Sequence, residues 1–428
     1  MKKQLFIAVA IFLLFKTQAQ TWFVIPDTNF ANYLHTIVPT AMQHDSLDTS
    51  NPLVTTTTHS INVYNKNISD LNGVQYFTSL TYLNCGGNPI TNLPALSNNL
   101  TYLNCSSTFL PNLPILPSSL VHLYCQSNSF TSLPALPNSL TLLCCNTNSL
   151  TTLPALPSSL DTLICGENKL TNLPVLPSSL IDLWCGTNSL TTLPALPNLL
   201  AYLDCSYNNL TNLPTLPVSL TYLECALNSL SNLPILPNSL VVLDCDNNSL
   251  TTLPALPNSL RQLYCYRNSL TGLPVLPDSI TNLNCEYNQV ECFPFIPNTI
   301  PVSALHIDFN PFNCLPNYTK AMSSDTITYP LCAAGNTHGC AVAGINEIVN
   351  TNNQIKMYPN PSTGNFIIET DSEEKQIVNI YDVSGRVVLV KDIYGNTPFN
   401  LSSFPTGVYS VSIISSTHVF NTRMLLNN

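Results

Sequence analysis

The stretch LVVLDCDNNSLTTLPALPNS, residues 240–259, decides the fold because it is one copy of a unit that recurs every twenty residues. The unit reads LxxLxCxxNxLxxLPxLPxS, and we number its positions one to twenty from Leu240. Eleven copies run from Leu80 to about Asn298. Position six is a cysteine in every copy: Cys85, Cys105, Cys125, Cys145, Cys165, Cys185, Cys205, Cys225, Cys245, Cys265 and Cys285. This strict periodicity predicts a solenoid of stacked coils.

Each position of the unit has a physical role. Leu243 and Cys245 are two residues apart, so they project from the same face of a short strand. The leucines expected to turn inward at the following bends are Leu240, Leu250, Leu253 and Leu256. One unit cannot cover this apolar side, but stacked units cover each other, with parallel strands about 4.8 Å apart. Pro254 and Pro257 favour an extended, polyproline-like back without helices.

An asparagine stands at position nine of every copy except one, where Thr108 replaces it. These residues are Asn88, Asn128, Asn148, Asn168, Asn188, Asn208, Asn228, Asn248, Asn268 and Asn288. An amide side chain both donates and accepts hydrogen bonds. The column therefore predicts an asparagine ladder that satisfies the backbone groups at each bend.

The cysteines fall into three groups. Parallel strands in register hold the column cysteines about 4.8 Å apart and pointing the same way, whereas a disulfide needs Cβ atoms about 3.5–4.5 Å apart. We therefore expect buried free thiols. Cys144 is expected to be a surface thiol, because His122, the nearest base, lies about 8 Å away by strand geometry. The disulfide candidates outside the period are Cys292, Cys314, Cys332 and Cys340, and Cys292–Cys314 with Cys332–Cys340 is one of three possible connectivities.

The parts of the chain before and after the copies differ in pattern. Residues 1–19 combine Lys2 and Lys3 with a short apolar run and a small residue, which predicts a signal peptide and no membrane span. Residues 20–60 are expected to form an N-terminal cap whose helix starts at Asp27 or Thr28. A 22-residue unit begins the solenoid, which is expected over 61–316. A cysteine-containing cap over 317–340 and a linker over 341–356 follow.

Composition excludes several classes of function. The formal net charge is −10 and only 8% of residues are charged, against about 25% in ordinary domains. An acidic chain with so few basic residues is a poor candidate for binding nucleic acid. The sequence has no HExxH, GxSxG or P-loop motif and no histidine cluster with metal-ligand spacing. We therefore expect no enzyme activity, no cofactor and no metal site.

The pattern LxxLxCxxNxLxxLPxLPxS resembles the twenty-residue bacterial leucine-rich repeat, which also occurs in secreted enterobacterial effectors. The leading unit, which ends in LNGVQYFTSL, resembles the longer repeat of internalin-like arrays. The resemblance implies a β-rich leucine-rich-repeat solenoid with a parallel concave sheet and a polyproline-like convex face. A small antiparallel β-sandwich is expected to follow it.

That sandwich is expected over residues 357–428, where short runs of Val, Ile and Tyr alternate with turn residues. YPNPSTGNF at 358–366, YDVSGRVV at 381–388, FPTGVY at 404–409 and the basic residue Arg423 resemble the type A C-terminal sorting domain of type IX secretion cargo. The resemblance implies that this domain contacts the type IX machinery. It also implies a secreted protein, or one on the outer surface of a Gram-negative bacterium.

The outward strand positions, three and five, vary while the inward positions hardly change, which is typical of a binding scaffold. Tyr124, Ile164 and Trp184 are expected to form an exposed strip. The candidate ligand-binding residues are Tyr102, His122, Tyr124, Trp184, Tyr202, Asp204, Tyr222, Glu224, Asp244, Asp246 and Tyr264. Aromatic and acidic residues in this arrangement suit a carbohydrate or a basic protein patch, although the acids alone could simply be a solvated face.

The leading hypothesis is thus a secreted or cell-surface binding or adhesion protein that recognises a protein or glycan on an external surface. The alternative is a surface or biofilm structural protein that self-associates through the array.

Overall fold

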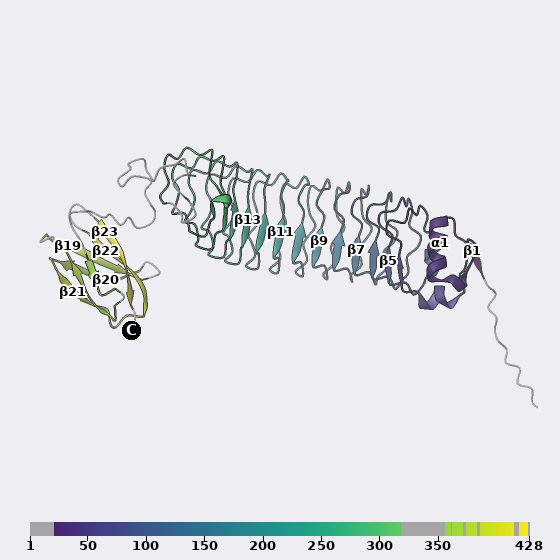
Figure 1. Cartoon of the computed structure of the whole chain (residues 1–428), viewed down its shortest axis with the longest axis horizontal. Coiled ribbons are helices and arrows are strands. Elements are labelled where there is room, and N and C mark those ends of the chain that lie inside the picture. The colour runs from purple at the N-terminus through teal and green to yellow at the C-terminus, as the bar shows by residue number, and fades with distance from the viewer. Residues whose placement is uncertain are drawn as a thin grey trace, which may run out of the picture. The chain divides into compact units, whose positions relative to one another are not determined.

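The computed structural model of the chain describes residues 21–317, 356–360, 362–370, 374–382, 386–414 and 419–426. The predicted signal peptide at 1–19 lies outside these residues. The segment 318–355, which contains Cys332 and Cys340, also lies outside them. The chain divides into two compact units, Met1–Ala334 and Gly335–Asn428, each taken by itself below (Figure 1).

The first unit opens with a cap of small elements. They are β1 (Trp22–Val24), α1 (Thr28–Ile37), the 3-10 turn η1 (Pro39–Ala41), β2 (Met42–Gln43), β3 (Ser46–Asp48) and the π-helical turn η2 (Leu53–Thr57). Asp27 caps α1 by accepting a hydrogen bond from the Phe30 amide at 2.9 Å, which confirms one of the two predicted caps. Its second carboxylate oxygen accepts from the amide and hydroxyl of Ser69, so the cap is tied to the first coil. The antiparallel sheet of β1, β3 and β2 was not predicted.

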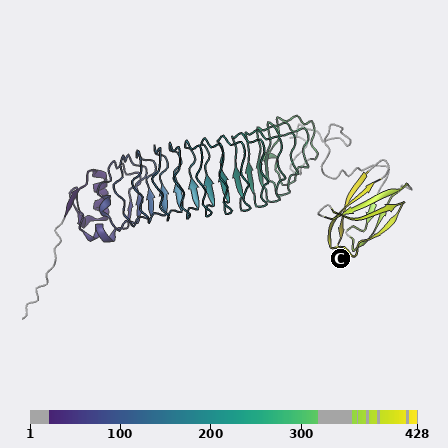
Figure 2. The same ribbon diagram turned by 180° about the vertical axis from the view of Figure 1, so that it is seen from behind.

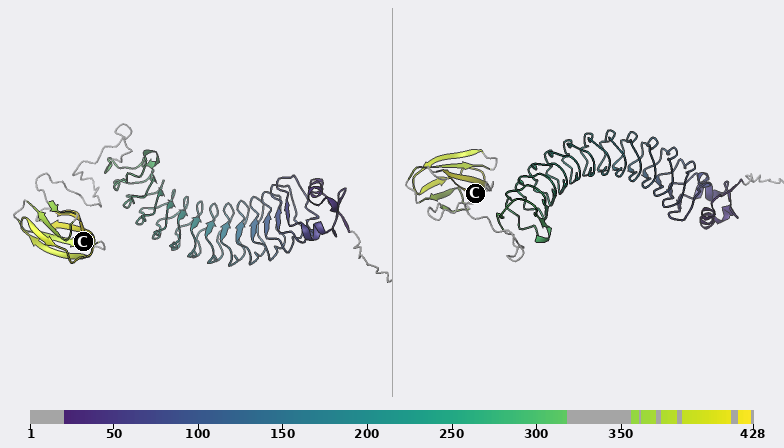
Figure 3. Two further views of the ribbon diagram at one scale, coloured as in Figure 1. Left: turned by 60° about the horizontal axis from the view of Figure 1, so that its bottom comes forward. Right: turned by 90° about the horizontal axis from the view of Figure 1, so that it is seen from above.

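The repeats form one sheet of thirteen strands, β4 to β16, in chain order. Their bounds are β4 Ser60–Asn62, β5 Tyr82–Asn84, β6 Tyr102–Asn104, β7 His122–Tyr124, β8 Leu142–Cys144, β9 Thr162–Ile164, β10 Asp182–Trp184, β11 Tyr202–Asp204, β12 Tyr222–Glu224, β13 Val242–Asp244, β14 Gln262–Tyr264, β15 Asn282–Asn284 and β16 Leu305–His306. Every pair is parallel; Ile61 pairs with Leu83 at one end and Leu283 with Leu305 at the other, so both atypical end units stack as predicted. The 3-10 turns η3 (Val74–Tyr76) and η4 (Val302–Ala304) lie in these end units. Figures 2 and 3 show the strands stacked as rungs and the coils of this unit following an arc.

The interior of the coils is the predicted leucine and cysteine core. In the unit at 240–259, Leu240, Leu243, Cys245 and Leu250 are fully buried, and Leu253 is nearly so. Leu256 is partly buried and packs against this core. All eleven column cysteines are buried and free, as predicted. Between β5 and β15, where every residue is described, the chain contains no helix, which confirms the expected helix-free back.

The asparagine ladder satisfies the backbone at each bend. The Asn208 side-chain amide donates to the carbonyl oxygens of Cys185, Cys205 and Ser206 at 3.0–3.1 Å. Its side-chain oxygen accepts from the Leu190 amide at 2.9 Å. One side chain thus bridges two coils with four hydrogen bonds, which confirms the predicted role. At the exceptional copy, the Thr108 hydroxyl lies 3.1 Å from the Cys105 carbonyl oxygen.

A second polar ladder, whose role the sequence did not indicate, runs along position twenty. The Ser239 hydroxyl lies 2.6 Å from the carbonyl oxygen of Leu220, one turn earlier at position one of its own unit, and 2.7 Å from that of Val218 in the preceding unit. The same contact to the preceding position-one carbonyl recurs at Ser119, Ser139, Ser159, Ser179, Ser219, Ser259 and Ser279. Side chains therefore hold successive coils together at both ends of the strand face.

The second unit contains two antiparallel sheets. Its strands are β17 Lys356–Tyr358, β18 Asn365–Glu369, β19 Gln376–Tyr381, β20 Val387–Ile393, β21 Thr397–Asn400, β22 Gly407–Ile414 and β23 Val419–Leu426. The sheet orders are β17-β18-β21 and β20-β19-β22-β23. Phe366 and Phe399 from one sheet share a core with Val378, Tyr409 and Met424 from the other, so the predicted sandwich is confirmed.

The motif residues of this unit have structural roles. The Asn360 side-chain nitrogen donates to the Arg423 carbonyl oxygen at 2.7 Å, and its side-chain oxygen accepts from the Leu425 backbone amide at 2.9 Å. These two hydrogen bonds hold β23 in place. Arg386 pairs with Asp382 at 3.1 Å across a turn. The Tyr409 hydroxyl donates to the Pro405 carbonyl oxygen at 2.7 Å.

We predict that Asn208→Ala lowers the free energy of unfolding by about 3 kcal/mol or more, because each buried backbone group left without a partner costs about 1–3 kcal/mol. Asn212→Ala is the control, because Asn212 is exposed and its amide reaches only the neighbouring Thr211 hydroxyl at 3.5 Å. Urea denaturation followed by circular dichroism measures both. Equal destabilisation by the two variants would contradict the ladder's role.

Candidate functional site on the strand face

The strand face consists of the side chains at positions three and five. Each strand from β5 to β15 has three residues, with the middle leucine buried and the two flanking side chains directed outward. Because the pairing is in register, residues twenty apart lie side by side, as Tyr202 does with Tyr222. Two continuous columns of side chains therefore cross the sheet on a fixed frame.

Three aromatic side chains stack in the middle of this face. The ring centroids of Trp184 and Tyr202 are 4.1 Å apart, and those of Tyr202 and Tyr222 are 4.4 Å apart, with planes 17° and 12° from parallel. Both faces of the Tyr202 ring are therefore covered. Burial and the nearby Glu224 raise the pKa of Tyr222 to about 12. The stack thus offers edges and neutral hydroxyl groups to a partner.

A second aromatic group lies on lower-numbered strands. Tyr82 and Tyr102 stack at 4.4 Å, while Tyr124 and His122 lie 5.3 Å and 6.2 Å from the Tyr102 ring. Burial raises the pKa of Tyr102 to about 12. No charged residue separates these rings. This second aromatic group therefore differs from the central stack in having no carboxylate beside its rings.

Carboxylates line the strands that follow the central stack. Asp204 pairs in register with Glu224, and Glu224 with Asp244. The Asp204 carboxylate accepts from the Ser206 amide at 2.9 Å, and Glu224 accepts from the Tyr222 hydroxyl at 3.0 Å. Burial, with the neighbouring acids, raises the pKa of Glu224 and of Asp244. Half-buried carboxylates of this kind favour a cationic partner.

Asp246 has the most perturbed carboxylate of the group. Its carboxylate accepts a hydrogen bond from the Tyr266 amide at 2.6 Å. Burial, and secondly the charge of Asp244, raise its pKa from 3.8 to about 7. The charge of this part of the face therefore changes near neutral pH.

The structure brings some candidate residues together and separates others. Trp184, Tyr202, Tyr222, Asp204, Glu224, Asp244 and Asp246 form one continuous central group. Tyr102, His122 and Tyr124 belong to the second aromatic group. Tyr264 pairs with Asp244 at the far side of the acids, and its hydroxyl lies 3.3 Å from the Gln262 side-chain oxygen.

One expectation about exposure was wrong and another holds only for Trp184. Cys144 is 6% exposed rather than a surface thiol, because the longer side chains of Tyr124 and Ile164 flank it in register. Its thiol contacts the Asn146 side-chain oxygen at 3.2 Å, and burial raises its pKa to about 11. The strip of Tyr124, Ile164 and Trp184 is also less open than expected. Tyr124 and Ile164 are half-buried, and Trp184 is 39% exposed.

Cys292 and Cys314 are both disulfide-bonded. Because Cys332 and Cys340 are outside the described residues, the connectivity among the four stays a prediction. The twelve other cysteines of the described part are free.

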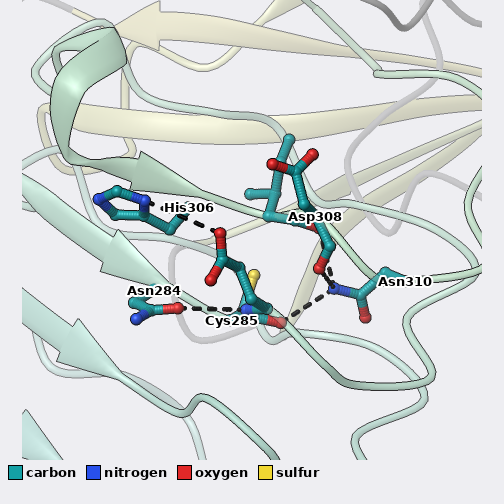
Figure 4. Close-up of polar contacts among 7 residues, drawn as sticks. Asn284, Cys285, His306, Asp308 and Asn310 are labelled. Carbon is teal, nitrogen blue, oxygen red and sulfur yellow. Dashed lines mark hydrogen bonds and ion pairs between the residues drawn. The ribbon is translucent and has the colours of Figure 1, made fainter.

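The last coil repeats the contacts of the regular ones (Figure 4). The Asn310 amide donates to the carbonyl oxygens of Cys285 at 2.9 Å and Asp308 at 3.2 Å. The Glu286 amide donates to the Asn284 side-chain oxygen at 3.2 Å, and the Glu286 carboxylate lies 3.9 Å from His306. The polar edge of the strand face therefore continues to the end of the solenoid.

Sequence reasoning missed a feature of the turn that follows each strand. The residue before each ladder asparagine, at position eight, has a left-handed backbone, with φ between 49° and 58°. These residues are Ser107, Ser127, Thr147, Glu167, Thr187, Tyr207, Leu227, Asn247, Arg267, Tyr287 and Phe309. Only the first copy has a glycine there, Gly87, so no glycine column signalled the conformation.

The charged residues of the array are confined to one side of it. Between residues 80 and 277 they occur only at positions two to ten of the unit: Asp161, Glu167, Lys169, Asp182, Asp204, Glu224, Asp244, Asp246, Arg261 and Arg267. The back, positions eleven to twenty, has none until Asp278. Among the described residues there is no group of His, Cys, Asp and Glu arranged to hold a metal. None of the helices in this part could span a membrane.

Known proteins share both parts of the chain. Residues 356–427 match the secretion system C-terminal sorting domain family. YopM, a leucine-rich effector protein from Yersinia pestis, has 30% sequence identity and a TM-score of 0.54, with 61% of this chain and 86% of YopM aligned. The functional domain of InlJ from Listeria monocytogenes, described as including a cysteine ladder, has 21% identity and a TM-score of 0.59, with 96% and 100% aligned. No curated protein sequence matches the chain.

We predict that stability rises as the pH falls from about 7.5 to 5, because Asp246 binds its proton more tightly in the folded state than in the unfolded state. The folded-state pKa is near 7 and the unfolded value near 3.8, so this contribution is present at low pH and is lost as the pH rises through 7. Asp246→Asn should flatten the dependence, and Asp278→Asn, on the back, should not. Thermal melts across this pH range measure the effect, and an unchanged slope in Asp246→Asn would contradict it.

We also predict that the twelve free thiols resist alkylation in the native state, because burial raises the pKa of Cys85 to about 12 and that of Cys144 to about 11. Iodoacetamide at neutral pH followed by peptide mass spectrometry should find these cysteines unmodified until urea is added. Rapid labelling of Cys144 in the native protein would contradict the burial of its thiol.

Proposed function

Because this chain belongs to the bacterial leucine-rich-repeat proteins and carries a secretion system C-terminal sorting domain, we propose that it is a secreted or cell-surface binding protein. The strand face recognises an external partner, and the protein acts as an adhesion or recognition module without catalysing a reaction. The solenoid is typical of interaction scaffolds.

The observation that carries this proposal is the uneven distribution of charged residues within the repeat. Between residues 80 and 277 the inward positions and the back have no charged residue. All charged residues in this range belong to the strand and its adjoining turns. Solubility alone would not require that the back remain uncharged. A partner that contacts the strand face and its adjoining turns explains why charge is confined to that side of the array.

The central group best fits a basic patch on a protein. A sugar commonly stacks on the open face of an aromatic ring, but both faces of the Tyr202 ring are covered by its neighbours. Tyrosine hydroxyl groups and half-buried carboxylates at Asp204, Glu224 and Asp244 instead suit lysine and arginine side chains. A glycan that binds through hydroxyl contacts remains the other ligand class of this proposal.

The route to the outside follows from the two ends of the chain. We assign the predicted signal peptide at 1–19 to the first export step, and the sorting domain to the type IX machinery of a Gram-negative cell. Asn360 and the Asp382–Arg386 pair hold that domain together, so its motif residues support the recognised shape. The strand face would then be presented at the cell surface or released.

One observation favours the second candidate, a self-associating surface protein. The uncharged back carries exposed apolar side chains, with Ile115 and Ile235 91% and 88% exposed and Val175 similarly open. Concentration-dependent sedimentation of the mature protein separates the two candidates. A monomer at high concentration excludes self-association.

The decisive variant changes Asp204→Asn, Glu224→Gln and Asp244→Asn together. We expect it to bind at least about ten-fold more weakly to whatever protein the wild type selects on a surface-protein and glycan array, because close charge pairs contribute about 1.5 kcal/mol or more. Asp278→Asn on the back is the control. Unchanged binding by the triple variant would refute a role for these acids.

A further inference from the structure

We propose that the edge of the strand face in the C-terminal half of the array is a docking surface for a protein segment in which apolar and basic side chains alternate. We call this surface the edge ridge and define it as two pairs of residues at position eight, Tyr207 with Leu227 and Tyr287 with Phe309, which Asn247 and Arg267 separate at the same position. It extends the proposed function, on which it rests for the acidic neighbours that it uses.

The backbone at the ridge residues does not favour large side chains. Their φ angles are 51°, 52°, 56° and 58°. In this left-handed region glycine and asparagine fit best, and bulky side chains are strained. Gly87 and Asn247 occupy the same position of other coils with the same sign of φ. Large apolar residues at a strained position call for an explanation outside local stability.

The N-terminal half of the array provides the comparison. There position eight holds Ser107, Ser127, Thr147, Glu167 and Thr187, with φ between 51° and 56° and only Glu167 large. The same backbone turn is thus built with small polar side chains over many coils. The change to large apolar residues begins at Tyr207, where the acidic column of the strand face also begins.

The ridge side chains are exposed to solvent, and two of them contact each other. Tyr207 is 56% and Phe309 62% exposed, and Leu227 and Tyr287 are also exposed. The Tyr287 and Phe309 rings stack with centroids 4.1 Å apart. The Arg267 guanidinium lies 5.5 Å from the centre of the Tyr287 ring and stiffens this part of the ridge. Apolar surface held in place in this way is typical of interfaces.

Charge complementarity selects the partner. Acids stand at position seven, directly before the ridge column, at Asp246, Glu286 and Asp308. Asp204, Glu224 and Asp244 lie on the adjoining strands. The chain as a whole has a net charge of −10. A segment that lays apolar side chains on the ridge therefore runs beside the carboxylates at positions five and seven, which favours lysine or arginine among its other side chains.

The test uses a fluorescent peptide of about ten residues that alternates leucine and lysine, and a matched peptide that alternates serine and lysine. The ridge variant combines Tyr207→Asn, Leu227→Asn, Tyr287→Asn and Phe309→Asn in the full chain. The control variant places asparagine at Ser107, Ser127, Thr147 and Thr187. Fluorescence anisotropy at physiological salt measures binding, and thermal melts check folding.

We expect the wild type and the control variant to bind the leucine–lysine peptide alike, and the ridge variant at least about ten-fold more weakly. The serine–lysine peptide should bind weakly and equally to all three. The ridge variant should melt at or above the wild-type temperature, because asparagine tolerates the left-handed backbone. A lower melting temperature would show that the ridge side chains stabilise the coils and would overturn the proposal.

The proposal is also overturned if the wild type does not prefer the leucine–lysine peptide, or if the ridge variant binds it as tightly. The triple variant at Asp204, Glu224 and Asp244 distinguishes the two proposals. If it keeps wild-type binding while the ridge variant loses it, the ridge stands and the acidic strand face fails. The opposite pattern removes the ridge and leaves the proposed function in place.

Discussion

The structure depends on the side-chain amide that joins each coil to the one before it. Asn248 donates to the carbonyl oxygens of Cys225 and Cys245, one in each of two successive coils, and accepts from the Leu230 amide. The turn after each strand can therefore be buried without leaving backbone groups unpaired. Because the bond set spans twenty residues, it also fixes the register. Leu223 can pair only with Leu203 and Leu243, and a slip of one residue would reverse every side chain.

Fixed register has an electrostatic consequence for the strand face. Side chains of like charge at the same position cannot move apart along the sheet, so Glu224 stays between Asp204 and Asp244. The protein limits the cost in two ways: hydrogen bonds, such as that from Tyr222 to Glu224, and a pKa of Asp246 raised to about 7 by burial and Asp244. The rigid frame thus holds carboxylates close together, and a cationic partner would reduce the repulsion between them.

The sequence predicted what repeats and missed what depends on neighbours. Period and pattern predicted the strands, the buried thiols and the ladder, because each follows from one position in the unit. The burial of Cys144 was missed because it depends on Tyr124 and Ile164 in other coils. The left-handed turn was missed because position eight is filled by residues such as Thr147 and Tyr207. The cap sheet of β1, β2 and β3 was missed because strands of two or three residues carry too little pattern to recognise.

The inside of the array is uniform, whereas its outer edge changes along the chain. Position six is cysteine from Cys85 to Cys285, yet position eight changes from residues such as Thr147 and Glu167 to Tyr207 and Leu227 at the coils where the column of Asp204, Glu224 and Asp244 begins. A coil that already satisfies its backbone through the ladder tolerates such changes, because position eight takes no part in the ladder's side-chain hydrogen bonds. The buried frame and the proposed recognition surface are therefore assigned to different positions of the same twenty-residue unit. A surface that mixes apolar and acidic groups can be confined to one half of the array while the other half keeps the same frame.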